Sequence, residues 1–248
     1  MKNILITCAT SAIGSHTASL LHSPTNRLVL AARDIDKLKE ISGPMQNSVQ
    51  LSLDFSSTES VDNCINDIDQ PLDGVVFIIP RISATTNFFP QDEEWHTLFD
   101  HYFIKPLRLL RKLYEQQLYA TGCKIVCVSG ISSKQALTNY AMNNCLRSAW
   151  LGQIKSLALG LAKDKVILNT LSMGGVLTEN YINKLEQKAA SLDMEYNALM
   201  LQEVDNIPLG AYATVAQVSG AIASLLGAIS DHMTGQNIIL DGGFIRAY

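Results

Sequence analysis

The feature that most constrains the fold is a regular alternation of short apolar runs with longer amphipathic stretches along the whole chain. The apolar runs have Ile, Val and Leu at consecutive positions, as expected of strands that are buried on both faces of a sheet. The stretches between them place apolar residues three and four positions apart, which is helical spacing. This alternation predicts an α/β fold with a doubly wound parallel β-sheet of about seven strands flanked by helices. The expected strands are 3–7, 27–31, 49–53, 74–79, 124–129, 166–171 and 237–240.

The longest predicted helices cover 94–118 and 139–162. Neither a linker nor an internal repeat interrupts the pattern, so residues 1–248 are expected to form a single domain. The segment 178–206 is more polar and breaks the rhythm before the last helix and strand. An insertion at this point would lie over the carboxyl ends of the strands, where ligands bind in such folds. We therefore expect 178–206 to act as a substrate lid.

Composition excludes several classes of function. The net charge of -4 argues against a nucleic-acid partner, which usually meets a basic face. The longest apolar runs fall short of the roughly 18 residues of a membrane span. The apolar run at the start of the chain is too short for the hydrophobic region of a signal peptide. The 47% hydrophobic and 17% charged content suits a large core and a surface partly covered by subunit contacts. Five cysteines without metal-type spacing indicate a reducing, cytoplasmic setting and no metal site.

Three segments near the C-terminus carry a family pattern in order and spacing: Pro208-Leu209-Gly210, Thr234-Gly235-Gln236 and Leu240-Asp241-Gly242-Gly243. Asn169, Gly174 and Thr178 match a further stretch, N-x-x-x-P-G-x-x-x-T, in which Met173 replaces the Pro. With these residues the chain resembles the short-chain dehydrogenase/reductase (SDR) family, and most of all its 3-oxoacyl-[acyl-carrier-protein] reductases. The resemblance covers essentially the whole chain. It implies a Rossmann-like fold and an oxidoreductase that uses a nicotinamide cofactor.

The turn that would hold the cofactor pyrophosphate keeps only part of its pattern. The family's T-G-x-x-x-G-x-G is read here as T-C-A-T-S-A-I-G over 7–14, so Thr7 and Gly14 match. Cys8 and Ala12 each add a Cβ where a glycine normally allows a tight turn or a close approach of the pyrophosphate. The helix that follows still offers N–H groups and the positive end of its dipole. We expect binding of NADP(H) to be weakened or absent.

Three other residues match the family's cofactor site. Arg33 follows the second strand, where the resemblance implies a contact with the 2′-phosphate of NADP. Asp54 follows the third strand, where the family places an Asp against the adenine, and Thr178 completes the set. The structural alternatives are an exposed Arg that opens a helix and an Asp that caps one. Against cofactor binding, the family's N-N-A-G on strand four is replaced by Phe77-Ile78-Ile79-Pro80.

The resemblance implies a catalytic tetrad of Asn, Ser, Tyr and Lys, of which this chain matches only the Tyr, as Tyr140. Asn144 stands at the Lys position, Gly130 at the Ser position and Tyr102 at the Asn position. Ser132 lies two residues beyond Gly130 in a shortened loop and is the candidate substitute for the Ser. In the family, Ser and Tyr bind and protonate the carbonyl oxygen while Lys lowers the pKa of the Tyr. An amide at position 144 has no charge with which to do so.

Loss of general acid–base catalysis typically lowers a rate by about 10²–10⁴. The sequence therefore favours a protein without ordinary reductase activity. Tyr140 fits the retained tetrad position and a packing residue at the start of a long helix equally well. If the site is merely disarmed, the double variant Asn144→Lys, Gly130→Ser is expected to recover some activity.

Three interpretations follow from these residues. The first, which we favour from the sequence, is a non-catalytic or regulatory subunit in a homo- or hetero-oligomer, a dimer or tetramer, paired with an active SDR paralogue. The second is an NADPH-dependent ketone or 3-oxoacyl reductase with a rearranged site. The third is a non-redox enzyme, such as a dehydratase, isomerase or cyclase, that uses the old substrate cleft. The apolar residues of 178–206 would suit an acyl or polyketide-like small molecule, and equally simple packing.

Overall fold

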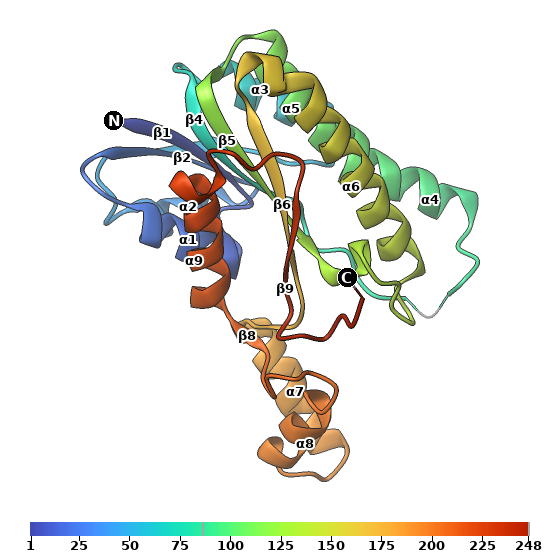
Figure 1. Cartoon of the computed structure of the whole chain (residues 1–248). Helices are drawn as coiled ribbons and strands as arrows, with labels where there is room; N and C mark the ends of the chain where they lie inside the picture. Colours follow the sequence, from blue (N-terminus) through green and yellow to red (C-terminus); the bar gives the residue numbers. More distant parts are fainter. Residues whose placement is uncertain (86, 248) are drawn as a thin grey trace.

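The structure, a computed structural model, describes residues 1–85 and 87–247 (Figure 1). Its centre is a parallel seven-stranded sheet of order β3-β2-β1-β4-β5-β6-β9, in which each neighbouring pair runs in the same direction. The strands are β1 (Lys2–Thr7), β2 (Asn26–Ala32), β3 (Ser48–Ser52), β4 (Leu72–Ile78), β5 (Tyr119–Gly130), β6 (Ile167–Met173) and β9 (Asn237–Leu240). The order reverses between β1 and β4, so the switch point of a doubly wound sheet lies where the chain leaves β1.

Helices cover both faces of the sheet, with α1, α2 and α9 on one side and α3, α5 and α6 on the other (Figure 1). On the α6 side, Phe77 of β4 is fully buried, and its ring lies 5.4 Å from that of Trp150. The helices are α1 (Ala12–Leu21), α2 (Ile35–Ser42), α3 (Thr58–Asn66), α4 (Asp92–Phe99), α5 (Lys105–Glu115), α6 (Ala141–Leu161), α7 (Glu179–Ser191), α8 (Tyr196–Glu203) and α9 (Val215–Leu226). None of those described is long and apolar enough to cross a membrane.

The doubly wound sheet expected from the sequence is confirmed, and each expected strand has its counterpart. The helix expected over 94–118 differs, because a π-helical segment at Asp100–Ile104 separates α4 from α5. A π-turn releases backbone carbonyls from the regular ladder. The carbonyl of Tyr102 instead accepts a hydrogen bond of 2.8 Å from the indole Nε1 of Trp150 on α6. The irregular turn is therefore held by a tertiary contact that helical periodicity does not reveal.

Most of the segment 178–206 forms α7 and α8, which project beyond the carboxyl ends of the strands (Figure 1). The two helices bury a small core of their own around Leu185, Ala189 and Leu199. At their base, the hydroxyl of Tyr212 lies 3.2 Å from a carboxylate oxygen of Glu203 at the end of α8. Most of the buried apolar side chains of this segment thus pack against each other.

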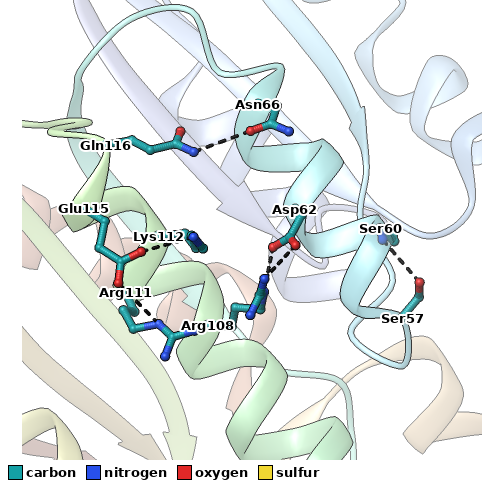
Figure 2. Close-up of polar contacts among 9 residues, drawn as sticks. All are labelled: Ser57, Ser60, Asp62, Asn66, Arg108, Arg111, Lys112, Glu115 and Gln116. Carbon is teal, nitrogen blue, oxygen red and sulfur yellow. Dashed lines mark hydrogen bonds and ion pairs between the residues drawn. The ribbon is translucent and has the colours of Figure 1, made fainter.

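Polar contacts join α3 to α5 on the surface (Figure 2). The guanidinium of Arg108 makes two hydrogen bonds to the carboxylate of Asp62, at 2.6 and 2.7 Å. One helical turn from this pair along α3, Gln116 donates to Asn66 at 3.4 Å. The two-point geometry between Arg108 and Asp62 makes this pair the strongest of these contacts.

The pair predicts a pH-dependent stability. The hydrogen bond from Arg108 lowers the pKa of Asp62, so its contribution is present above the ordinary carboxyl pKa and is lost as the pH falls through the lowered value. Asp62→Asn is expected to lower Tm by at most about 2 °C near neutral pH, and the loss should disappear in acid. Thermal unfolding at both pH values tests this. Glu186→Gln is the control, because Glu186 is exposed in the middle of α7 and makes no ion pair or side-chain hydrogen bond among the described residues, so Tm should change at neither pH.

Candidate functional site

The turn after β1 is tight although two of the family's three glycines are replaced, and the N–H of Ser11 donates to the carbonyl of Cys8 at 2.9 Å. Cys8 takes the first glycine position with φ +47°, a left-handed conformation that residues other than glycine seldom adopt. Ser11 caps α1, and its hydroxyl accepts from the N–H of Gly14 at 3.1 Å. A Cβ on Gly14 would lie 2.4 Å from the carbonyl oxygen of Cys8. The retained glycine is therefore the one on which close packing of the turn against α1 depends.

Thr7 supports the sheet. Its side chain is fully buried, and its hydroxyl both donates to the carbonyl of Ile78 and accepts from the N–H of Ile78, each at 2.7 Å. These two bonds tie the end of β1 to the end of β4. Strand four lacks the family's polar side chains, and Thr7 supplies the hydrogen bonds that hold its carboxyl end.

The other expected cofactor residues follow β2 and β3 at the carboxyl edge of the sheet or lie at the start of α7. Arg33 is exposed directly after β2, close enough for its charge to act on both Cys8 and Asp54. Burial raises the pKa of Asp54, but two hydrogen bonds of 2.8 Å from Ser56 and the charges of Arg33 and His101 outweigh it, so the pKa lies below its ordinary value. Thr178 caps α7 by accepting from the N–H of Tyr181 at 3.3 Å. Asp54 and Thr178 thus both stabilise local turns.

A cation that the motif positions do not include lies at the carboxyl end of the sheet. Arg147, on α6, donates from Nη1 to the hydroxyl oxygen of Ser132 at 2.9 Å. Ser132 is buried in the short 3-10 turn Ile131–Ser133 that follows β5. A Cβ built on Gly130 would lie 2.4 Å from Nη1 and 2.7 Å from Cζ of Arg147. The guanidinium therefore occupies space that any side chain at position 130 would take.

Tyr140 stands at the start of α6, half-buried, two helical turns before Arg147. Its backbone pairs with Thr85 in an isolated β-bridge, which joins the loop after β4 to the start of α6. Burial lowers the pKa of Arg147, the nearby Tyr140 phenol opposes this, and the charge of Arg81 adds to it. Arginine nevertheless stays protonated in proteins, so the site holds a permanent positive charge beside the phenol and the Ser132 hydroxyl.

The remaining tetrad positions do not join this group. The amide of Asn144 accepts from the N–H of Leu137 at 3.2 Å and donates to its carbonyl at 3.0 Å. Asn144 therefore fastens the loop before α6. The Tyr102 side chain packs at the edge of the apolar core on the α6 face. The structure brings Ser132 and Arg147 into contact beside Gly130, and the Tyr140 phenol lies near enough for its charge to act on Arg147.

A signal for Arg147 was present in the sequence. Arg147 lies seven positions after Tyr140, and seven steps of about 100° bring a side chain back to the same face of a helix. The side chain of a helical residue also leans toward the preceding turns, here toward Tyr140. Among the described residues, no group of three or more His, Cys, Asp or Glu side chains is arranged to hold a metal ion.

Comparison with known proteins identifies relatives over the full length of the chain. A family model described as "Enoyl-(Acyl carrier protein) reductase" matches residues 8–245. The chain is 24% identical over 249 residues to the 3-oxoacyl-[acyl-carrier-protein] reductase FabG of Rickettsia prowazekii, covering 98% of this chain and 97% of that protein.

Solved structures show the same fold. L-sorbose reductase from Gluconobacter frateurii, complexed with NADPH and L-sorbose, superposes with a TM-score of 0.91 at 21% identity, over 100% of this chain and 97% of that one. An NADPH-bound short chain oxidoreductase from Pseudomonas aeruginosa PAO1, described as containing an atypical catalytic center, gives 0.85 at 20% identity, over 100% and 98% of the two chains.

Proposed function

This chain belongs to the short-chain dehydrogenase/reductase family, and on that premise we propose that it is an NADPH-dependent carbonyl reductase with a rearranged site. The observation that carries the proposal is the hydrogen bond of 2.9 Å between Arg147 and Ser132, next to Tyr140. The sequence favoured a non-catalytic subunit because three tetrad positions are lost and because the phosphate turn and strand four depart from the family pattern. Arg147 offers a cation from a different position, which favours the second of the three interpretations.

The residues present fit NADP(H). The turn at Cys8 keeps a left-handed conformation, and the first N–H groups of α1 have no partner within the helix, so they are suited to a phosphate. Arg33 stands exposed at the end of β2, where a guanidinium would meet the 2′-phosphate that distinguishes NADPH from NADH. Two solved relatives of the same fold are described as holding NADPH. When bound, NADPH supplies the hydride that reduces a carbonyl carbon.

The chain's own residues would handle the carbonyl oxygen. The Tyr140 hydroxyl donates the proton that this oxygen takes up. Because Ser132 accepts from Arg147 with a lone pair, its own hydrogen remains free to point at the substrate oxygen. Arg147 sets a fixed positive charge beside both hydroxyls and stabilises the negative charge that develops on the oxygen, in a half-buried site where such charges act strongly.

Cofactor titration and turnover test this proposal. The purified protein is titrated with NADPH and with NADH by fluorescence, and NADPH oxidation is then followed with a panel of ketones and 3-oxoacyl thioesters. Submillimolar binding with a preference for NADPH, together with oxidation by at least one carbonyl compound, is the expected result. Binding without turnover across the panel would favour a regulatory subunit, and failure to bind either nucleotide would reject the proposal.

A further inference from the structure

The charge of Arg147 differs from that of the other partly buried cations in the described part of the chain. Arg27, Lys105, Arg108 and Lys124 each pair with a carboxylate. Within residues 1–85 and 87–247, no Asp or Glu oxygen comes within the 4.0 Å of an ion pair with Arg147. A partly buried charge without a counter-ion is costly, and an anionic ligand would remove this cost.

The geometry of the guanidinium indicates which anion suits it. Arginine carries five N–H donors in a planar fork, and Arg147 spends one of them on the neutral Ser132 hydroxyl. The opposite edge of such a fork matches the two oxygens of a carboxylate. Position 130 adds no side chain between the guanidinium and the carboxyl end of β5. A carboxylate bound here would lie next to Ser132 and Tyr140, and hence within a few bonds of a carbonyl held by these two residues.

A neighbouring cation adds to the positive charge at Arg147. Arg81, in the loop after β4, lies near enough for its charge to act on Arg147. That loop is held over α6 by the amide of Asn143, which donates to the carbonyl of Ile82 at 3.2 Å. Asn143 is fully buried one turn before Arg147, so its bond fixes the loop that carries Arg81. The loop thus places a second cation near Arg147, whose charge no carboxylate of the described residues neutralises.

We propose that the substrate is an oxo acid, with the fork of Arg147 binding the carboxylate while Tyr140 and Ser132 hold the nearby ketone. This inference rests on the proposed reductase function and names its substrate class. Reduction adds the hydride of NADPH and the proton of Tyr140 across the C=O bond, giving a hydroxy acid and NADP⁺. The phenol regains its proton from solvent, and the carboxylate is unchanged.

Matched pairs of acids and their esters test the inference. Short 2-oxo and 3-oxo acids and their methyl esters are compared as substrates of the wild type and of Arg147→Met, Arg147→Lys and Arg111→Met. The wild type is expected to prefer acid over ester in kcat/KM, and Arg147→Met to lower that preference by about 10- to 100-fold, as for a hydrogen-bonded charge pair. Arg147→Lys should keep part of it, since it keeps the charge but not the fork. Arg111 is exposed on α5 beside Glu115, so Arg111→Met should leave the preference unchanged.

The possible failures are distinguishable. A wild type that reduces the esters as well as the acids, or an Arg147→Met variant that retains the preference, overturns the oxo-acid inference and leaves the reductase in place. If no carbonyl compound oxidises NADPH, the proposed function fails. Calorimetric titration with the oxo acids then tests separately whether Arg147 binds a carboxylate. The site is supported if the oxo acids bind to the wild type but not to Arg147→Met. It is overturned if they do not bind to the wild type. Near-UV circular dichroism identifies any variant that fails to fold.

Discussion

Gly130→Ala is expected to keep the fold and the affinity for NADPH while lowering turnover by about 10²- to 10³-fold. The added methyl group would lie 2.4 Å from Nη1 of Arg147, so the guanidinium must leave its place beside Ser132. The atoms in the way belong to the end of a flexible side chain, and rotating that chain costs the fold little. Loss of one preorganised donor to the reacting oxygen typically lowers a rate by this factor. Thermal unfolding, NADPH titration and steady-state kinetics measure the three quantities.

Gly152→Ala is the matched control for this change. Gly152 lies on α6, and a Cβ there would meet no atom within 4 Å, so stability should rise slightly and turnover should stay the same.

The double variant Asn144→Lys, Gly130→Ser restores two family residues and tests the role of Arg147 more sharply. On the sequence alone it was expected to recover activity, but the structure reverses this expectation. The serine would displace Arg147, and the lysine would give up both bonds of Asn144 to Leu137. A gain of activity in this variant would contradict the assignment of Arg147.

The fold was predictable because strands buried on both faces leave an unmistakable pattern of consecutive apolar residues. The alternation with helices predicted a doubly wound parallel sheet of about seven strands, and the strand β9 was predicted to the residue. The π-segment Asp100–Ile104 was missed because its apolar spacing continues that of its flanking helices. The carbonyl of Tyr102 within it accepts a bond from Trp150, which lies 48 residues away along the chain, and helical periodicity carries no sign of such a contact.

The sequence placed the candidate site only in part. Tyr140 stands at a motif position, and Ser132 was proposed as a substitute two residues beyond one. Thr7 shows the limit, because a motif gives the identity of a residue but not the direction of its side chain, and Thr7 points at Ile78. Arg147 shows the opposite limit. A long side chain reaches a site from a position two turns away, and the loss of a side chain at Gly130 makes the room. The missing side chain at Gly130 looks like damage in the sequence, but in the structure it makes room for the guanidinium of Arg147.

The other large effect is expected at Gly14, the single glycine retained in the turn after β1. A Cβ at this position would lie 2.4 Å from the carbonyl oxygen of Cys8 and 2.9 Å from Cα of Ala9. Both are backbone atoms, so unlike at position 130 no side chain can rotate away, and α1 must move off the turn. Cys8 already holds a left-handed conformation, which costs about 1–2 kcal/mol, so the turn has little freedom left to adjust.

Gly14→Ala is therefore expected to lower the free energy of unfolding by roughly 1–3 kcal/mol or more and to weaken NADPH binding at least about tenfold. Urea unfolding followed by circular dichroism and fluorescence titration measure the two effects. Gly220→Ala on α9 is the control, because a Cβ there meets no atom within 4 Å, and it should stabilise the protein by about 0.5–1 kcal/mol. If Gly14→Ala behaved like Gly220→Ala, the turn would be looser than its contacts imply. The close packing of α1 against it would then not be what positions the helix N-terminus for a phosphate.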